Sequence, residues 1–462
     1  MLAAQAKQLL DGEPEGVAEA LEVVSGFDDV LVHGLARVGE AQSGALAAFA
    51  VALAACPLRD RVAEAVEKVR AGSIGDEHLM ALAGGRTALL GAVHDAYLGR
   101  LDAALGRTRA TWESTGSNVE KESGNLLAGC RSWLSELAIT GWRGVGHDLV
   151  EACGNAIQAA YAEPKLRRLA VLLDGLASEL RAASPTATME HVPVRRWADL
   201  WSRAMLLSQP GALSAPAATT EVSGRLLILG VDIHEHETAV QFQVHGVLEE
   251  AGAQPRLVRA SISAGKTNTV SGLPLWRLLL GYPQMLKGLA DHSVLELSAM
   301  PLLPSGDLVW LDDRAAATPE AADPFATARV LLAVAVAPPV PPLQRHPVRI
   351  AEPVLLEGQV LEGGSIEGGS IELDPGRLPS CGPLTPELVK SASSCIGLLR
   401  WDAGRWHVQP IAVQTLVKKK PVTVHNGQWA LGHPDPKVAK ASSGAGDTVA
   451  ILRERAGRLL RK

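Results

Sequence analysis

The spacing of apolar residues divides the chain into two parts that meet near residue 210. Before this point, apolar side chains recur at steps of three and four residues, most regularly in residues 88–105 and 166–183. This spacing predicts amphipathic helices. Polar and glycine-rich breaks separate these helices at 12–16, 71–77, 114–118, 141–148 and 184–188. Short connections of this kind favour antiparallel neighbours, so we expect a helical bundle or an irregular helical array.

After residue 224 the apolar residues alternate with polar ones. Residues 225–233, 238–248 and 256–264 follow this period of two, which predicts three strands of an antiparallel meander. Further along, the pattern predicts a helix over 273–290, strands over 294–303 and 307–313, and a helix over 325–337.

A second β-rich stretch follows a Pro-rich segment. It contains two hairpin candidates, one turning at Ala403-Gly404 and the other at Asn426-Gly427, because a Gly-containing pair between apolar runs is typical of a hairpin turn. The fold class that we predict is therefore a multidomain α+β protein, in which an N-terminal all-α helical domain is followed by two small β-rich α+β units. The expected organisation is a helical domain (1–210), a linker (211–224), an α+β unit with an antiparallel meander (225–337), a Pro-rich linker (338–347) and a β-rich unit ending in an amphipathic basic helix (348–462).

Composition narrows the class of protein. Hydrophobic residues make up 47% of the 462 residues, and the net charge is −6 with a pI near 6.1, which argues against binding of nucleic acid or an anionic membrane by the whole chain. The five cysteines are scattered without a C-x-x-C pair, which favours a reducing compartment. No signal-peptide pattern opens the sequence, and the apolar run at 45–56 is too short to span a membrane. We therefore expect a cytoplasmic protein, and the Ala- and Arg-rich, Lys-poor composition suggests a bacterial source.

The segment VDIHEHET, residues 231–238, is the sharpest chemical feature. On a strand, Asp232, His234 and His236 would share one face, and His245 could approach from the facing strand, so a divalent metal site is one interpretation. The same residues fall where two strands should turn, and a turn is polar without any metal. No second motif supports a metalloenzyme. We favour the turn and expect no cofactor, with the metal site as the alternative.

Motifs for the common enzyme classes are missing from the sequence. The Gly265-Lys266-Thr267 triplet lacks the earlier glycine of a phosphate-binding loop, since Ala260 occupies that position. Neither a nucleophile elbow nor a dinucleotide fingerprint after a strand occurs. The sequence thus does not exclude an enzymatic role, but the missing motifs favour a protein that is not an enzyme.

Two helices are candidate partner-binding elements. Trp197 and Trp201 lie four apart, hence on one helical face, and we expect this face to pack between the helical domain and the first β-rich unit, with exposure to a separate partner as the alternative. The terminal basic helix carries apolar and arginine side chains that could dock on a partner or pack on its own domain. Those side chains include Leu452, Arg453, Leu459 and Arg461.

These patterns favour a non-catalytic interaction or scaffold component of a bacterial cytoplasmic multiprotein assembly, with other proteins as partners and no membrane span. One alternative is a metal-dependent enzyme that uses Asp232, His234 and His236. The third interpretation is nucleic-acid binding through the basic C-terminal helix, which would fall steeply with salt.

Overall fold

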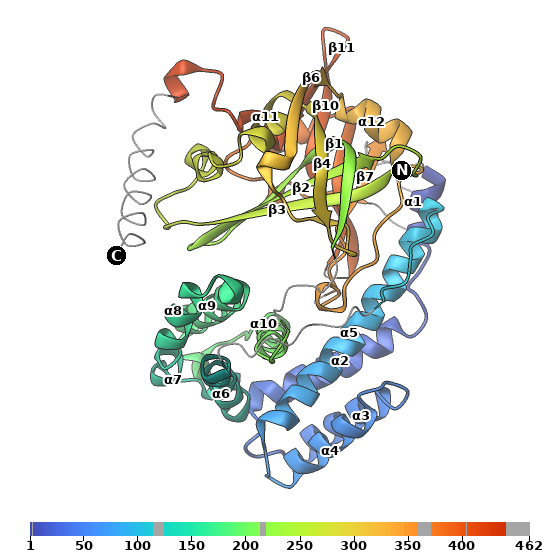
Figure 1. Cartoon of the computed structure of the whole chain (residues 1–462). Coiled ribbons are helices and arrows are strands. Elements are labelled where there is room, and N and C mark those ends of the chain that lie inside the picture. Colours follow the sequence, from blue (N-terminus) through green and yellow to red (C-terminus); the bar gives the residue numbers. More distant parts are fainter. Residues whose placement is uncertain are drawn as a thin grey trace.

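The computed structural model describes residues 1, 3–113, 124–212, 219–346, 348–358, 371–402 and 404–439. Within these residues, an N-terminal helical region precedes two units built on β-sheets, and the sheets lie together on one side of the helices (Figure 1). The predicted multidomain α+β fold class is confirmed. Leu452, Arg453, Leu459 and Arg461 of the predicted terminal helix lie outside the described residues.

The helical region follows the apolar stripes of the sequence. In α9, for example, Leu169, Leu173, Leu176 and Leu180 recur at steps of three and four and are all buried. The helices are α1 (Ala3–Leu10), α2 (Val17–His33), α3 (Glu40–Ala52), α4 (Arg59–Arg70), α5 (Asp76–Leu105), α6 (Gly124–Thr140), α7 (His147–Glu151), α8 (Gly154–Ala162), α9 (Arg167–Ala183) and α10 (Val194–Leu207).

The two tryptophans of α10 lie in the core of the helical region. Trp197 packs edge-on against Trp142, at 6.1 Å between ring centroids, and the indole N–H of Trp201 donates to the Leu134 carbonyl at 2.9 Å. Both side chains are buried with the apolar side chains of neighbouring helices. This position corrects the expectation that they contact the β-rich unit or a separate partner, because the helical region buries this face of α10 itself. The spacing of the apolar residues in α10 indicates that this face is buried, but it does not indicate which part of the molecule covers the face.

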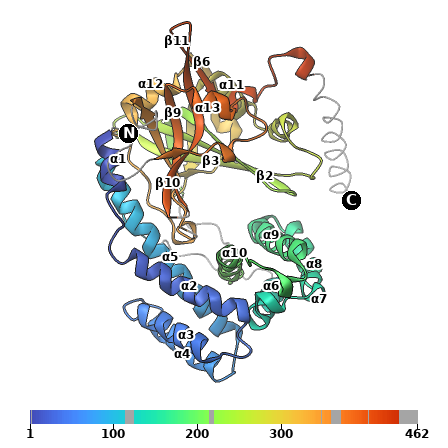
Figure 2. The same ribbon diagram turned by 180° about the vertical axis from the view of Figure 1, so that it is seen from behind.

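Helix α5 joins the helical region to the sheets. Its N-terminal half contributes Leu82 and Leu90 to the helical core, whereas Tyr97 and Leu101 of its C-terminal half pack in a second core with residues of β7, β9 and β10. Tyr97 stacks 4.3 Å from the Trp401 ring, measured between centroids. One long helix therefore spans both parts of the molecule, as Figures 1 and 2 show.

The first sheet begins with the predicted meander β1–β2–β3, whose strands pair antiparallel in the order of the sequence. Strand β4 pairs with the first half of β1, so that the sheet curls back on itself. Its strands are β1 (Thr220–Glu235), β2 (Ala239–Glu249), β3 (Arg256–Gly265), β4 (Ser293–Leu302), β5 (Asp307–Leu308) and β6 (Ala315–Ala321).

The second sheet packs face to face with the first. It has the order β11–β10–β9–β7, with β8 beside β10. Leu229 and Val247 of the first sheet share a core with Ile396 and Ile411 of the second, and a Cβ on Gly230 would lie 2.9 Å from Ile411, so only glycine permits this approach. The strands are β7 (Glu352–Glu357), β8 (Glu372–Leu373), β9 (Ser394–Asp402), β10 (Arg405–Val417) and β11 (Lys420–His425).

The helices that flank the sheets are shorter than the pattern predicts. The stretch 273–290 forms a 3₁₀ turn and then α11 (Pro283–Asp291), since Pro283 fits the first turn of a helix better than its interior. Helix α12 (Pro324–Leu331), capped by the Asp323 side chain, also ends before 337, and α13 spans Pro386–Lys390.

One predicted hairpin is confirmed and one is wrong. Strands β9 and β10 pair antiparallel up to Asp402 and Arg405, as in the predicted hairpin, and Ala403 of its turn lies outside the described residues. Asn426-Gly427, in contrast, does not turn between strands: β11 pairs with β10, and the chain reverses at Lys418-Lys419, whose φ angles of 50° and 64° are both positive. A two-residue hairpin turn needs this conformation, and lysine adopts it rarely, so the sequence pointed to the Asn-Gly pair instead. The Asn426 amide is buried and donates to the Val231 carbonyl at 3.3 Å.

Among the described residues, no helix is both long enough and apolar enough to cross a membrane.

Candidate functional site between the helices and the sheets

The segment VDIHEHET forms the end of the β1–β2 hairpin. The last paired residues are Glu235 and Val240, and the His236 backbone N–H donates to the Ala239 carbonyl at 2.8 Å. The structure thus confirms a turn at His236–Thr238, whereas Val231–Glu235 belong to strand β1.

The tip of this hairpin reaches the helical region. The Tyr161 hydroxyl on α8 lies 2.8 Å from the Thr238 hydroxyl and donates to the Asp174 carboxylate on α9 at 3.0 Å. The His236 ring lies over Gly175, where a Cβ would be 3.9 Å from its Nε2 atom. Figures 1 and 2 both show the hairpin extending from the sheets toward α8 and α9. The polar tip therefore forms one contact between the two parts of the molecule.

Asp232 lies inside the molecule, between the two sheets. Its carboxylate accepts hydrogen bonds from Arg400 on β9 at 2.9 Å and from the Gln409 amide on β10 at 2.7 Å, and it lies 2.7 Å from Nε2 of His234. Burial opposes ionisation, but the hydrogen bond with His234 and the charge of Arg400 outweigh it and hold the pKa of Asp232 well below its usual range. His234 is 37% exposed, so an ionised acid orients a histidine that solvent can reach.

The four residues predicted as metal ligands do not form one set. Asp232 and His234 touch, but His236 lies at the hairpin tip, and burial lowers the pKa of His245 to about 3 in a separate position. There His245 lines a cavity of about 30 Å³ beside Arg259 and Glu352. In the part of the chain that the structure describes, no group of three or more His, Cys, Asp and Glu side chains is placed to hold a metal. Arg400 and Gln409 occupy the Asp232 oxygens that a metal would need.

A second contact between helices and sheets surrounds the buried guanidinium of Arg86. Its Nη2 donates to Asp28 at 2.8 Å, and its Nη1 lies 2.8 Å from Asp199 and 2.9 Å from Nε2 of His346. His346 belongs to the segment that descends from the sheets toward α10 (Figure 1). Burial alone would lower the pKa of Arg86, but the two acids raise it. The charge is thus fully matched.

Three further arginines belong to the segments that carry these contacts, and we call Arg168, Arg203 and Arg349 the junction arginines. They come from α9, from α10 and from the segment that leads into β7. None of them makes a hydrogen bond or an ion pair with another described residue. Arg168 is exposed, and Arg203 and Arg349 are half-buried, although the Nε atom of Arg203 is buried without a partner.

The junction arginines also repel one another. Burial and the nearby Arg349 lower the pKa of Arg168, and burial, Arg168 and Arg349 lower the pKa of Arg203. Burial lowers the pKa of Arg349. The charge of Asp232 acts in the opposite direction but is outweighed, and the charges of Arg259 and Arg377 lower this pKa further. Such a cluster is unfavourable on its own. A guanidinium presents a planar fork of donors that matches phosphate or carboxylate oxygens, so an anion among these side chains would remove the repulsion.

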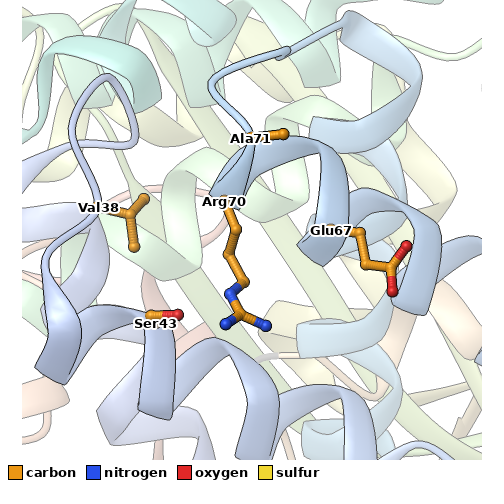
Figure 3. A pocket seen from close by; sticks show the side chains of 5 residues that line it. All are labelled: Val38, Ser43, Glu67, Arg70 and Ala71. Carbon is orange, nitrogen blue, oxygen red and sulfur yellow. The ribbon is translucent and has the colours of Figure 1, made fainter.

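A hollow on the far side of the helical region is less suited to chemistry. It has a volume of about 410 Å³ and is lined by Val38, Ser43, Glu67, Arg70 and Ala71. In Figure 3 the Arg70 side chain extends into the hollow between α3 and α4, whereas Glu67 points away from it. A single arginine beside a serine offers weak anion recognition compared with three converging arginines.

Sequence reasoning missed the residues of the junction. Arg86 carries a signal, since it interrupts an apolar stripe of α5 and a buried charge needs a partner. The junction arginines carry none, because positions 168, 203 and 349 lie in three segments that only the tertiary fold brings together.

In comparisons with known proteins, no family model, no curated protein and no solved structure matches this chain.

Proposed function

We propose that the protein is a non-catalytic interaction component of a multiprotein assembly, and that it holds an anionic group at the junction arginines. The observation that carries this proposal is that the charges of Arg168, Arg203 and Arg349 act on one another while none of the three is hydrogen-bonded or ion-paired to an acid among the described residues. Buried or half-buried charges are normally paired. An unpaired cluster at the boundary of two parts of a molecule is best explained by a ligand that pairs it.

The chemistry around the cluster is that of binding. The nearest acid–histidine pair is Asp232 with His234. Arg400 and Gln409 donate hydrogen bonds to Asp232 between the two sheets. Among the described residues, no nucleophilic side chain is a hydrogen-bond partner of this pair. Arginines that stay charged at neutral pH bind and orient an anion but do not transfer protons.

A metal-dependent enzyme remains the second candidate, and the 2.7 Å contact between Asp232 and Nε2 of the partly exposed His234 side chain supports it. Metal analysis of the purified protein separates the two proposals. A stoichiometric transition metal that is lost in a folded His234→Ala/His236→Ala variant would favour the enzyme. The third proposal, nucleic-acid binding by residues 447–462, concerns a segment beyond the described residues.

The test of the interaction proposal compares two double variants. Arg203→Met/Arg349→Met removes two junction charges, whereas Arg59→Met/Arg61→Met removes two exposed charges from α4 and serves as the matched control. Each tagged protein is recovered from its native host, and the proteins and small anions that co-purify are quantified by mass spectrometry. We expect an anion-bearing species in stoichiometric amount with the wild type and the control, and its loss with the junction variant. The same set of species with all three proteins would refute the proposal.

A further inference from the structure

The hairpin of β10 and β11 projects from the second sheet, and we call its end, residues 416–422, the lysine hairpin. Figures 1 and 2 both show β11 at the top of the molecule, beyond the other strands. Every residue from 416 to 422 is exposed, and Leu416, Val417 and Val422 are 64, 53 and 41% exposed. Large aliphatic side chains gain free energy from burial, so their grouping in one short segment indicates a surface that a partner covers.

The turn of the lysine hairpin carries three consecutive positive charges. Lys418, Lys419 and Lys420 are exposed, and none of them forms an ion pair with another described residue. The φ angles of Lys418 and Lys419 are 50° and 64°, values that lysine rarely adopts and that asparagine and glycine adopt readily. Lysine is therefore an unfavourable choice for the turn itself, which indicates a role for the two charges.

Protection of an exposed sheet edge explains only part of this segment. Strand β11 lies at an edge, since it pairs with β10 alone among the described strands. Lysine and proline on an edge strand hinder the addition of another strand, and Lys420 and Pro421 stand on β11. Lys418 and Lys419 lie beyond the paired residues, and the exposed aliphatic side chains favour contact instead of preventing it. The lysine hairpin is thus suited to contact through its end and not through the edge of β11.

The register places apolar side chains on both faces of the hairpin. Leu416 pairs with Pro421, and Val417 pairs with Lys420. Cross-strand partners share a face and successive residues alternate between faces. Leu416 and Pro421 therefore lie on one face, and Val417 and Val422 lie on the other. A flat surface covers one face of a hairpin, whereas a cleft covers both faces and meets the turn at its floor.

The order of these groups along the hairpin favours a protein cleft over a lipid bilayer. The lysines of the turn are outermost, and the apolar side chains lie behind them. In a bilayer the hydrocarbon lies deeper than the charged headgroups, so the lysines would enter the hydrocarbon before the apolar side chains could be buried, which is costly. A protein cleft has no such order, because acidic side chains can form its floor and apolar side chains its walls.

We propose that the lysine hairpin inserts into a cleft of another protein, whose acidic floor faces Lys418 and Lys419 and whose apolar walls cover Leu416, Val417 and Val422. This inference rests on the proposed function, since it names a contact surface and the chemistry of the partner in the assembly. The hollows described above are lined in part by arginines, so neither of them suits the lysines of a second copy.

The experiment begins with carbodiimide cross-linking of the tagged full chain in extracts of its native host. Carbodiimide joins a lysine amine to a carboxylate as an amide, takes up the water that is lost as a urea, and adds no spacer, so only groups in contact react. Mass spectrometry of the cross-linked peptides identifies the partner and its acidic residues. We expect cross-links from Lys418 or Lys419 to aspartate or glutamate residues of one protein, which is then purified for affinity measurements.

Two variants separate the charges from the apolar side chains. Lys418→Asn/Lys419→Gly removes both charges and gives the turn the pair of residues that it favours. Leu416→Thr/Val417→Thr removes exposed apolar surface and keeps residues that fit a strand. By calorimetry with the purified partner, we expect each variant to bind at least tenfold more weakly, and tenfold corresponds to about 1.4 kcal/mol. The charge variant should also lose most of the dependence of affinity on salt.

Two controls make the result specific. Lys418→Arg/Lys419→Arg keeps both charges, and Arg59→Met/Arg61→Met removes two exposed charges from α4. Both should bind the partner within about twofold of the wild type, since neither alters the proposed contact. Circular dichroism and the thermal midpoint of each variant confirm that it is folded.

Four results would overturn the inference. The first is a set of lysine-hairpin cross-links no richer than that of other exposed lysines, and the second is partner affinity unchanged in both hairpin variants. The third is cross-linking between isotopically labelled and unlabelled copies of this chain through the hairpin. The fourth is co-sedimentation with vesicles of phosphatidylglycerol and phosphatidylcholine, or binding to homopolymeric RNA, that Lys418→Asn/Lys419→Gly abolishes.

The failure of this inference is distinguishable from the failure of the proposed function. The junction variant Arg203→Met/Arg349→Met leaves the lysine hairpin unchanged. If the hairpin variants retain every co-purifying protein while the junction variant loses its anion-bearing species, this inference is wrong and the proposed function stands. If the partner is lost only with the hairpin variants, the lysine hairpin is the contact surface and the anion site at the junction arginines is wrong.

Discussion

Two groups of arginine side chains lie at the boundary between the helices and the sheets, and they differ in their partners. Arg86 is fully buried and meets Asp28, Asp199 and His346 at distances between 2.5 and 2.9 Å. The junction arginines are more exposed and are not ion-paired to any acid in the part of the chain that the structure describes. Arginine thus occurs at this boundary in two situations: Arg86 has its charge balanced by acids, and the junction arginines do not.

The difference separates what holds the molecule together from what is available to a ligand. A buried charge is tolerated when its partners replace the lost hydration, and removal of either partner is then costly. An unmatched cluster lowers stability in the absence of a ligand, as is common at binding sites. Three measurements test this contrast, from the largest expected effect to the smallest.

The largest effect is expected for Arg86→Met. The substitution leaves Asp28 and Asp199 buried without their main counter-charge, and we expect the free energy of unfolding to fall by about 3–5 kcal/mol in urea titrations. The matched control is Arg59→Met, which removes an exposed arginine and should change stability by less than about 0.5 kcal/mol. A loss below about 1 kcal/mol for Arg86→Met would show that the matched group is not a structural element.

An intermediate effect is expected from acid. Burial opposes the ionisation of Asp199, but the hydrogen bond with His346 and the charge of Arg86 lower its pKa to about 2. The pKa is thus lower in the folded state than in the unfolded state, so the ionised group stabilises the protein above the unfolded value of 3.8, and this stabilisation disappears as the pH falls through about 2.

We therefore expect Asp199 to contribute about 2 kcal/mol at pH 6 and about half of that at pH 3. The measurement is the difference in unfolding free energy between the wild type and Asp199→Asn at the two pH values. A difference that stays constant between pH 6 and pH 3 would contradict the low pKa.

The smallest effect, with the opposite sign, is expected for Arg203→Met in the absence of ligand. Replacement removes a charge that Arg168 and Arg349 repel and keeps an unbranched apolar side chain, so we expect stability to rise by about 1 kcal/mol. Thermal unfolding at low ionic strength measures it, with Arg86→Met as the reference of opposite sign. A loss of stability comparable to that of Arg86→Met would remove the contrast and make both groups structural.

The sequence was informative where a local pattern decides the structure. The change of period near residue 210 separated helices from sheets, the alternation around 231–238 located the β1–β2 turn, and the stripe of α10 indicated that Trp197 and Trp201 share a face. It was misleading where a local preference lost to a tertiary one. The Asn426-Gly427 pair did not turn, and strand β6, with four alanines in seven residues, has too few β-formers to be found by pattern.

The local sequence pattern decided only part of what surrounds Asp232 and His234 in the β1–β2 hairpin. Alternation places Asp232 and His234 on one face of β1, and this is how they meet. Whether that face binds a metal or receives hydrogen bonds from Arg400 and Gln409 depends on the second sheet, which lies more than 150 residues further along the chain.

By itself, then, the sequence determined the kinds of elements, their order and the polar character of the hairpin tip, because periodicity and turn chemistry act over a few residues. Only the tertiary structure decided which charges are matched. Arg86 meets Asp28 and His346 across 58 and 260 residues of the chain, and the charges of Arg168 and Arg349 act on Arg203 from other segments. Electrostatic energy depends on distance in space and on burial, and neither is written in the spacing of residues along a chain.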